Sequence, residues 1–203
     1  CVQLQDDVTP GHLLLSEFSH AAAEKIYSAV VQGTDGQKKL KPVLRPFDVL
    51  GSSRYIGFDT RRDTYRTRED KCHLNYVALD SDWEAKLAQS LEDMEEVVCY
   101  VKNQNLGFNV PYSHEATERT YLPDYIVRIK DCGPDLLNLI LEVTGERRRE
   151  KVAKADAART LWVPAVNNHG GFGRWAFLEI TDPWNAKNAI REFLKASEVA
   201  REA

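Results

Sequence analysis

The chain has 203 residues, of which 43% are hydrophobic and 29% are charged, and its formal net charge is −4. A chain of this length buries a core in one compact domain, with room for a small appendage. No run of about 18 apolar residues occurs, which excludes a membrane-spanning helix. The sequence begins without methionine or a signal pattern, so we expect a fragment of a longer chain. Its four cysteines are scattered without a CxxC pair, which favours reduced thiols in a cytoplasmic protein.

Residues 1–80 form the first of two expected regions, which is helical and irregular. A helix is expected at 12–32, and short strands are expected at 54–59 and 73–79. Basic residues outnumber acidic ones between positions 37 and 71. Arg61 and Arg62 lie in this basic stretch, which either faces solvent or contacts the phosphates of duplex DNA.

Residues 81–203 carry the stronger periodic patterns. Apolar residues three or four apart predict a helix that starts at Ser81 or Asp82 and includes Trp83 to Val98. The order of the later elements predicts an α/β fold, in which helices flank a mixed sheet. These elements are strands at 97–103, 119–130 and 137–144, a charged helix at 146–160, strands at 161–166 and 174–180, and a terminal helix at 182–203.

Two acidic residues, Asp124 and Glu142, interrupt apolar strands. Side chains alternate along a strand, so both acids can share one face if their strands are neighbours. Paired carboxylates repel each other and are costly to bury, and a Mg²⁺ ion would relieve both problems and activate water for attack on a phosphodiester. Other readings stay open: each acid pairs with Arg119 or Arg128, lies in solvent, or belongs to a glycosidase pair.

Five segments in order resemble a known family. Together they are similar to the C-terminal nuclease region of the helicase–nuclease (restriction) subunit of type III restriction–modification systems, in the PD-(D/E)xK superfamily. The resemblance covers about residues 50–190 and includes PD at 123–124 and EVT at 142–144. The segments are HLNYVALDSDWE, YVKNQNLGFNVPY, YLPDYIVRI, LNLILEVTGE and LWVPAVNNHGGFGRWAFLEI.

This resemblance implies a restriction-endonuclease-like core of order α-β-β-β-α-β and Mg²⁺-dependent cleavage of double-stranded DNA. Asp124 and Glu142 would be the metal ligands. It also implies a bacterial cytoplasmic protein that works with a modification (methyltransferase) subunit. The helicase domains would precede Cys1, and they would use ATP, because this chain has no GxxxxGK[ST] loop.

This sequence departs from the superfamily pattern at the third position of the motif, where Thr144 stands in place of a lysine. The lysine charge would stabilise the reacting phosphate, whereas threonine offers only hydrogen bonds to a water or a ligand. Lys151 and Lys154 lie three residues apart on the expected helix, so either is a candidate replacement, and Lys154 is preferred.

Three further readings remain open at this site. A second metal ion, with Glu84 or Glu146 as an extra ligand, could supply the missing charge. Lys102, at the end of the strand at 97–103, is a candidate contact for a DNA phosphate or a partner of local backbone groups. Alternatively, the domain is a degenerate nuclease fold that binds DNA or docks a partner subunit without catalysis.

Overall fold

The computed structural model of the protein describes residues 19, 21–23, 25–26, 40–44, 49–114, 117–145 and 149–202. The helix expected at 12–32 falls largely outside this part of the chain, as does Glu146. Among the helices that are described, none is long and apolar enough to cross a membrane.

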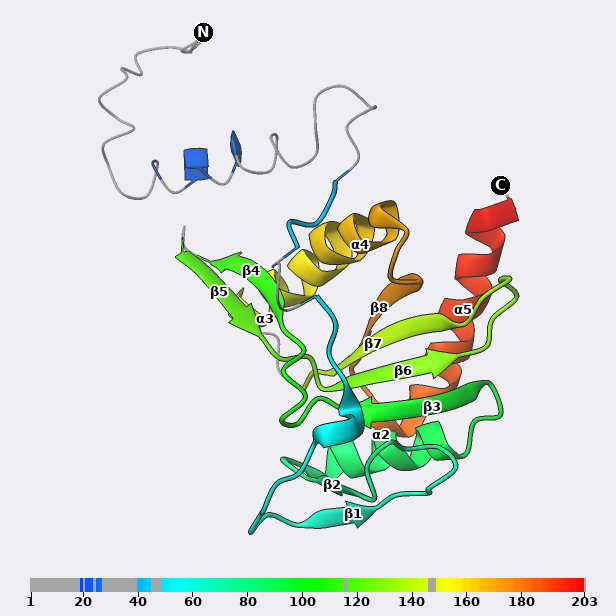
Figure 1. Ribbon diagram of the computed structural model, residues 1–203. Helices are drawn as coiled ribbons and strands as arrows, with labels where there is room; N and C mark the ends of the chain where they lie inside the picture. Colours follow the sequence, from blue (N-terminus) through cyan, green and yellow to red (C-terminus); the bar gives the residue numbers. More distant parts are fainter. Residues whose placement is uncertain are drawn as a thin grey trace, which may run out of the picture.

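A four-stranded mixed sheet lies at the centre of the fold (Figure 1). Its strands lie in the order β3-β6-β7-β8, in which β3 pairs with β6 and β6 with β7 in antiparallel fashion, and β8 joins β7 in parallel. The strands are β3 (Val97–Lys102), β6 (Tyr125–Ile129), β7 (Leu137–Val143) and β8 (Arg174–Ile180).

The helices complete the predicted order. α2 (Asp82–Glu92) precedes β3, and α3 (Arg149–Ala157) lies between β7 and β8 in the sequence. The parallel pairing of β7 with β8 requires such a crossover connection. The core α2-β3-β6-β7-α3-β8 therefore follows the α-β-β-β-α-β order, and the predicted α/β fold with a mixed sheet flanked by helices is confirmed.

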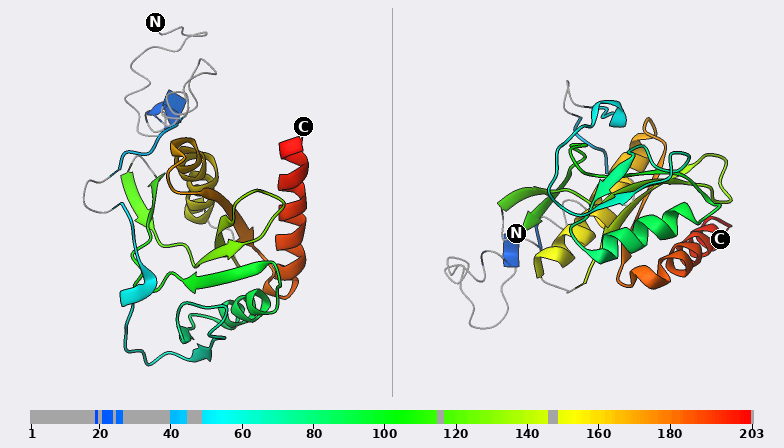
Figure 2. Two further views of the ribbon diagram at one scale, coloured as in Figure 1. Left: turned by 45° about the vertical axis from the view of Figure 1, so that its right-hand side comes forward. Right: turned by 90° about the horizontal axis from the view of Figure 1, so that it is seen from below.

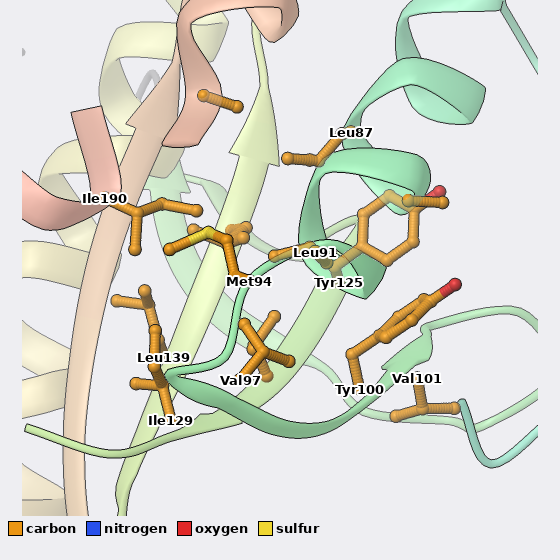
Figure 3. Close-up of a cluster of buried hydrophobic side chains, with 14 of the residues drawn as sticks. Leu87, Leu91, Met94, Val97, Tyr100, Val101, Tyr125, Ile129, Leu139 and Ile190 are labelled. Carbon is orange, nitrogen blue, oxygen red and sulfur yellow. The ribbon is translucent and has the colours of Figure 1, made fainter. Parts of the chain in front are cut away.

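The two faces of the sheet bury different side chains. Leu139 and Leu141 of β7 pack in one cluster with Leu87 of α2 and Ile190 of α5 (Ala186–Glu202), and several members are labelled in Figure 3. Figure 2 shows α2 beside the first turns of α5 in both views. Ile140, between the two leucines, projects to the opposite face and packs in a second cluster with α3.

A hairpin and a small two-stranded sheet flank this core. β4 (Val110–His114) and β5 (Thr117–Tyr121) pair between β3 and β6 in the sequence, and the hairpin projects from one side of the sheet (Figure 1). β1 (Thr64–Arg66) pairs with β2 (Tyr76–Ala78) ahead of α2. Val77 belongs to the same buried cluster as α2, so packing continues across the predicted domain boundary at residue 80.

Several local predictions are wrong. The expected strand at 161–166 is helical: Ala158–Trp162 form a π-helical turn and Val163–His169 form α4. The prediction failed because a short apolar run in a buried helix has the same pattern as a buried strand. Pro164 does not prevent a helix here, because proline is tolerated in the first turn. The helix expected to include Val98 ends at Glu92, and residues 53–55 form a 3-10 turn where a strand was expected.

The long strand expected at 119–130 is two strands. β5 ends at Tyr121 and β6 begins at Tyr125. Pro123 lies in the break, and a proline has no N–H to donate to a ladder of hydrogen bonds. This break matters for the site, because Asp124 is the last residue before β6.

Candidate functional site

The structure brings Asp124 and Glu142 together at one end of the central sheet. β6 and β7 pair with Tyr125 opposite Leu141, so the next position along the ladder sets Asp124 opposite Glu142. Asp124 Oδ2 accepts a hydrogen bond of 2.7 Å from the backbone N–H of Val143. This bond joins the residue before β6 to the end of β7, and it holds the two acids side by side.

Burial and repulsion raise the pKa of both carboxyl groups. Burial, and after it the negative charge of Asp124, raises the pKa of Glu142 to about 8. Burial raises the pKa of Asp124 to about 6, although the hydrogen bond from Val143 opposes the change. At neutral pH the pair therefore retains roughly one proton, because ionising both buried groups is unfavourable.

One carboxylate oxygen lacks a partner. Glu142 Oε2 is buried and accepts no hydrogen bond from the described residues, which is an unfavourable state for such an atom. Within the same part of the chain, neither acid forms an ion pair with Arg119 or Arg128, and Arg119 lies 3.5 Å from Glu150 instead. The arginine pairing that the sequence left open is therefore not observed.

A divalent cation fits this arrangement. Two adjacent carboxylates, one with an unpartnered oxygen, provide hard oxygen ligands and a negative charge that is poorly compensated. The described residues contain no group of three His, Cys, Asp or Glu side chains suited to hold a metal ion. A cation at this place would thus take few protein ligands and complete its shell with water, which is typical of Mg²⁺.

Two lysines of helix α3 supply positive charge near Glu142. The charge of Lys154, and to a smaller extent that of Lys151, lowers the pKa of Glu142 against the effect of burial. Lys154 Nζ lies 3.4 Å from Glu150 Oε1 and 5.6 Å from the ring centroid of Tyr112. Both lysines therefore lie within electrostatic range of the acids, and α3 holds Lys154 in place through a neighbour one turn away.

Thr144, which stands in the position of the superfamily lysine, is buried. It is 2% exposed, and its backbone N–H donates a 3.0 Å hydrogen bond to the carbonyl oxygen of Ile180 in β8. The pairing of β7 with β8 thus continues through this residue. Because a threonine is uncharged, Thr144 supplies no counter-charge to the two acids.

Of the two readings open for Lys102, its contacts fit that of a partner for nearby groups rather than a DNA contact. Its side chain is buried, and its ammonium donates to the carbonyl oxygen of Ala78 at 2.7 Å and lies 2.6 Å from Glu84 Oε2 and 3.3 Å from Asp80 Oδ2. An ammonium has three protons to donate, so these oxygens satisfy it. Lys102 instead neutralises Glu84, and its charge lowers the pKa of Asp124.

Arg61 and Arg62 are exposed in the segment before β1. Arg62 forms an ion pair with Asp80 at the molecular surface. Surface ion pairs of this kind are weak and exchange readily with solvent or with a phosphate. Both arginines remain candidates for contact with DNA.

Two residues near the acids escaped sequence analysis. Glu179 of β8 is paired with Glu142 in the parallel register, and Tyr121 ends the β5 strand that precedes the Pro123 break. The alternation of side chains along the strand at 174–180 places Glu179 on one face of that strand. Only the register between β7 and β8 brings it opposite Glu142, and a single sequence does not contain that information.

The fold defined by these elements is compatible with that of restriction-endonuclease-like proteins, and a family comparison points the same way. Residues 70–163 match the model of a family described as an endonuclease domain. The matched range contains Asp124, Glu142, Thr144 and both lysines of α3, and it supports a nuclease domain of the restriction-endonuclease-like kind. No curated protein and no solved structure matches the chain.

Proposed function

We propose that the protein is a Mg²⁺-dependent endonuclease domain that hydrolyses phosphodiesters of double-stranded DNA. The observation that carries this proposal is the pairing of two half-buried carboxyl groups, Asp124 and Glu142, at the end of the sheet. Their raised pKa values reflect burial first and then repulsion by nearby carboxylates, and a bound cation would offset both effects. The match of residues 70–163 to an endonuclease family supports the assignment to DNA chemistry.

The roles follow from the geometry. Asp124 and Glu142 hold the cation, which when bound supplies activated water and stabilises charge on the phosphate. Lys154 and Lys151 lie on the same side as Glu142 and offset negative charge that develops on the phosphate. Thr144, which is enclosed and hydrogen-bonded through its backbone, keeps the end of β7 in register with β8.

The biological setting that we propose rests on the resemblance of five segments to type III restriction subunits. In that setting the domain follows ATP-dependent helicase domains in one polypeptide and works with a modification (methyltransferase) subunit in the bacterial cytoplasm. Arg61 and Arg62 then contact the phosphates of the duplex, since they are exposed and basic.

A second function is favoured by one observation. Thr144 stands where the superfamily motif has a charged residue, and it is buried and uncharged. A domain that binds DNA or docks a partner subunit without cleaving would tolerate this change. In such a module the two acids would be a remnant of an active ancestor.

Cleavage of a plasmid separates the two functions. The complete subunit is incubated with supercoiled plasmid, Mg²⁺ and ATP, alongside Asp124→Asn, Glu142→Gln and the control Glu118→Gln, an exposed acid of β5. We expect nicking by the wild type and by the control, and a loss of at least about 100-fold in both site variants, as for removal of a group that stabilises the transition state. Equal nicking by all four proteins contradicts the site, and no nicking by any favours the docking module.

A further inference from the structure

The hydroxyl of Tyr121 is a further polar group within electrostatic range of the two acids. It has no role in the chemistry proposed above. The Tyr121 side chain is 6% exposed and packs in the second buried cluster with Ile140 of β7 and Phe177 of β8. Its ring meets that of Tyr112 edge-on, with 5.9 Å between centroids. The ring is therefore held in place by its packing.

The position of the ring sets its hydroxyl near the carboxylates. Ile140 and Phe177 each lie two residues before an acid on the same strand, Glu142 and Glu179 respectively. Residues two apart on a strand share a face, so the tyrosine packs on the face to which both acids project. Only two residues of the chain separate Tyr121 from Asp124, which approaches the same place from β6.

Two buried atoms lack partners at this place. The Tyr121 hydroxyl and Glu142 Oε2 are both enclosed, and neither forms a hydrogen bond with any residue that the structure describes. A buried tyrosine hydroxyl is normally paired. Burial, and then the charges of Glu142 and Asp124, raise the pKa of Tyr121, so the hydroxyl keeps its proton and acts as a donor. An unpartnered donor and an unpartnered acceptor thus lie on the same face of the sheet.

We propose that Tyr121 is a positioning residue that donates a hydrogen bond to Glu142 Oε2. The bond holds Glu142 in the orientation that binds a divalent cation. A neutral donor suits this purpose because it stabilises the carboxylate without competing with the cation for its charge. Such partners of metal ligands tune affinity in many metal sites. The inference rests on the proposed cation site.

The test compares cation affinity in variants that differ by one hydroxyl. Tyr121→Phe removes the donor and keeps the ring, and Tyr112→Phe is the matched control. Tyr112 is also buried, lies in the same hairpin, and donates its hydroxyl to Glu150 at 2.7 Å. Binding of Mn²⁺ to the 203-residue protein is measured by titration calorimetry between pH 6 and 9.

We expect Tyr121→Phe to weaken Mn²⁺ binding by about 10-fold or more, the range seen for partners of metal ligands. The pH at which binding is half-maximal should also rise, because the ionised form of Glu142 loses its donor. Tyr112→Phe should bind Mn²⁺ within about twofold of wild type. A merely structural tyrosine would change melting temperature and leave the pH profile of binding in place.

Results that overturn the inference can be told apart from a result that overturns its basis. If wild type and Tyr121→Phe bind Mn²⁺ equally at every pH, Tyr121 has no positioning role. If wild type and Glu142→Gln bind equally, the cation site itself is wrong. Replacing Tyr121 by 3-fluorotyrosine, which is a stronger donor, guards against misfolding of the phenylalanine variant. It should tighten binding, and unchanged affinity also counts against the proposal.

Discussion

The carboxylate of Asp124 accepts a 2.7 Å hydrogen bond from the backbone N–H of Val143, the residue that follows Glu142. A side chain thus takes the place of a backbone acceptor at the end of the β6–β7 ladder. Pro123 makes this possible, since the break that it causes leaves Asp124 just outside β6. The geometry of the acid pair is therefore determined by backbone pairing rather than by flexible side chains.

The stability of the cation-free protein should fall as pH rises. The pKa values of Glu142 and Asp124 are raised by folding to about 8 and about 6. Between roughly pH 4 and 8 the unfolded chain therefore binds fewer protons than the folded one, and rising pH favours unfolding. In chelator, Glu142→Gln should melt at least about 3 °C above wild type at pH 8.5 and close to it at pH 4.

Differential scanning calorimetry checks this expectation, with Glu118→Gln as an exposed control that should follow the wild type. A melting temperature of the wild type that stays constant from pH 6 to 8.5 would show that folding does not raise the pKa of Glu142.

Binding of Mg²⁺ should release a proton. At pH 7 the carboxyl of Glu142 retains its proton in the absence of a cation, because its pKa is about 8. A cation requires the ionised form, so about one proton per ion should be released at pH 7 and almost none at pH 9.5. Titration calorimetry in buffers with different ionisation enthalpies measures this number directly. Equal release at both pH values would contradict the assignment of Glu142 as a ligand.

Lys154 should matter more than Lys151 for cleavage. Both charges act on Glu142, and that of Lys154 acts more strongly. We expect Lys154→Met to reduce the rate of plasmid nicking by about 100-fold and Lys151→Met by less, while cation affinity changes little. Lys130→Met, an exposed lysine just beyond β6, is the control. If both α3 variants cleave as well as the control, neither lysine replaces the motif residue.

The main features of the fold were predictable because they depend on local patterns. Alternation located β7 and β8 to within one residue, and the periodic apolar positions located α2. The apolar run at 161–166 carries too few residues to distinguish a buried helical turn from a strand, and its proline favoured the wrong choice. Pro123 signals a break between β5 and β6. The apolar residues on both sides of this proline made the segment look like one continuous strand.

Part of the site depends on contacts between distant residues, which local patterns do not contain. The adjacency of Asp124 and Glu142 was predictable from acids in apolar strands. Lys102 also lies at the end of a strand, but its burial follows from Glu84 of α2, which approaches it only in the folded protein. Tyr121 was hidden for a similar reason, because its ring looks like an ordinary core residue until its hydroxyl is seen to lack a partner.

Lys102 should serve stability rather than DNA contact. Its ammonium lies 2.6 Å from Glu84 Oε2 in the protein interior, so Lys102→Met leaves a buried carboxylate without its counter-charge. The expected cost is about 3–5 kcal/mol in the free energy of unfolding. The double variant Lys102→Met/Glu84→Gln should recover much of this loss. Urea denaturation measures both values, and equal stability of the single variant and wild type would contradict the buried ion pair.

The most direct test of the central claim is a crystal structure of the protein grown with Mn²⁺, read from its anomalous difference map. The account predicts a single strong peak bridged by the carboxylates of Asp124 and Glu142, at about 2.1 Å from each bound oxygen. A saturating concentration of Mn²⁺ that leaves these two side chains without a peak would contradict it.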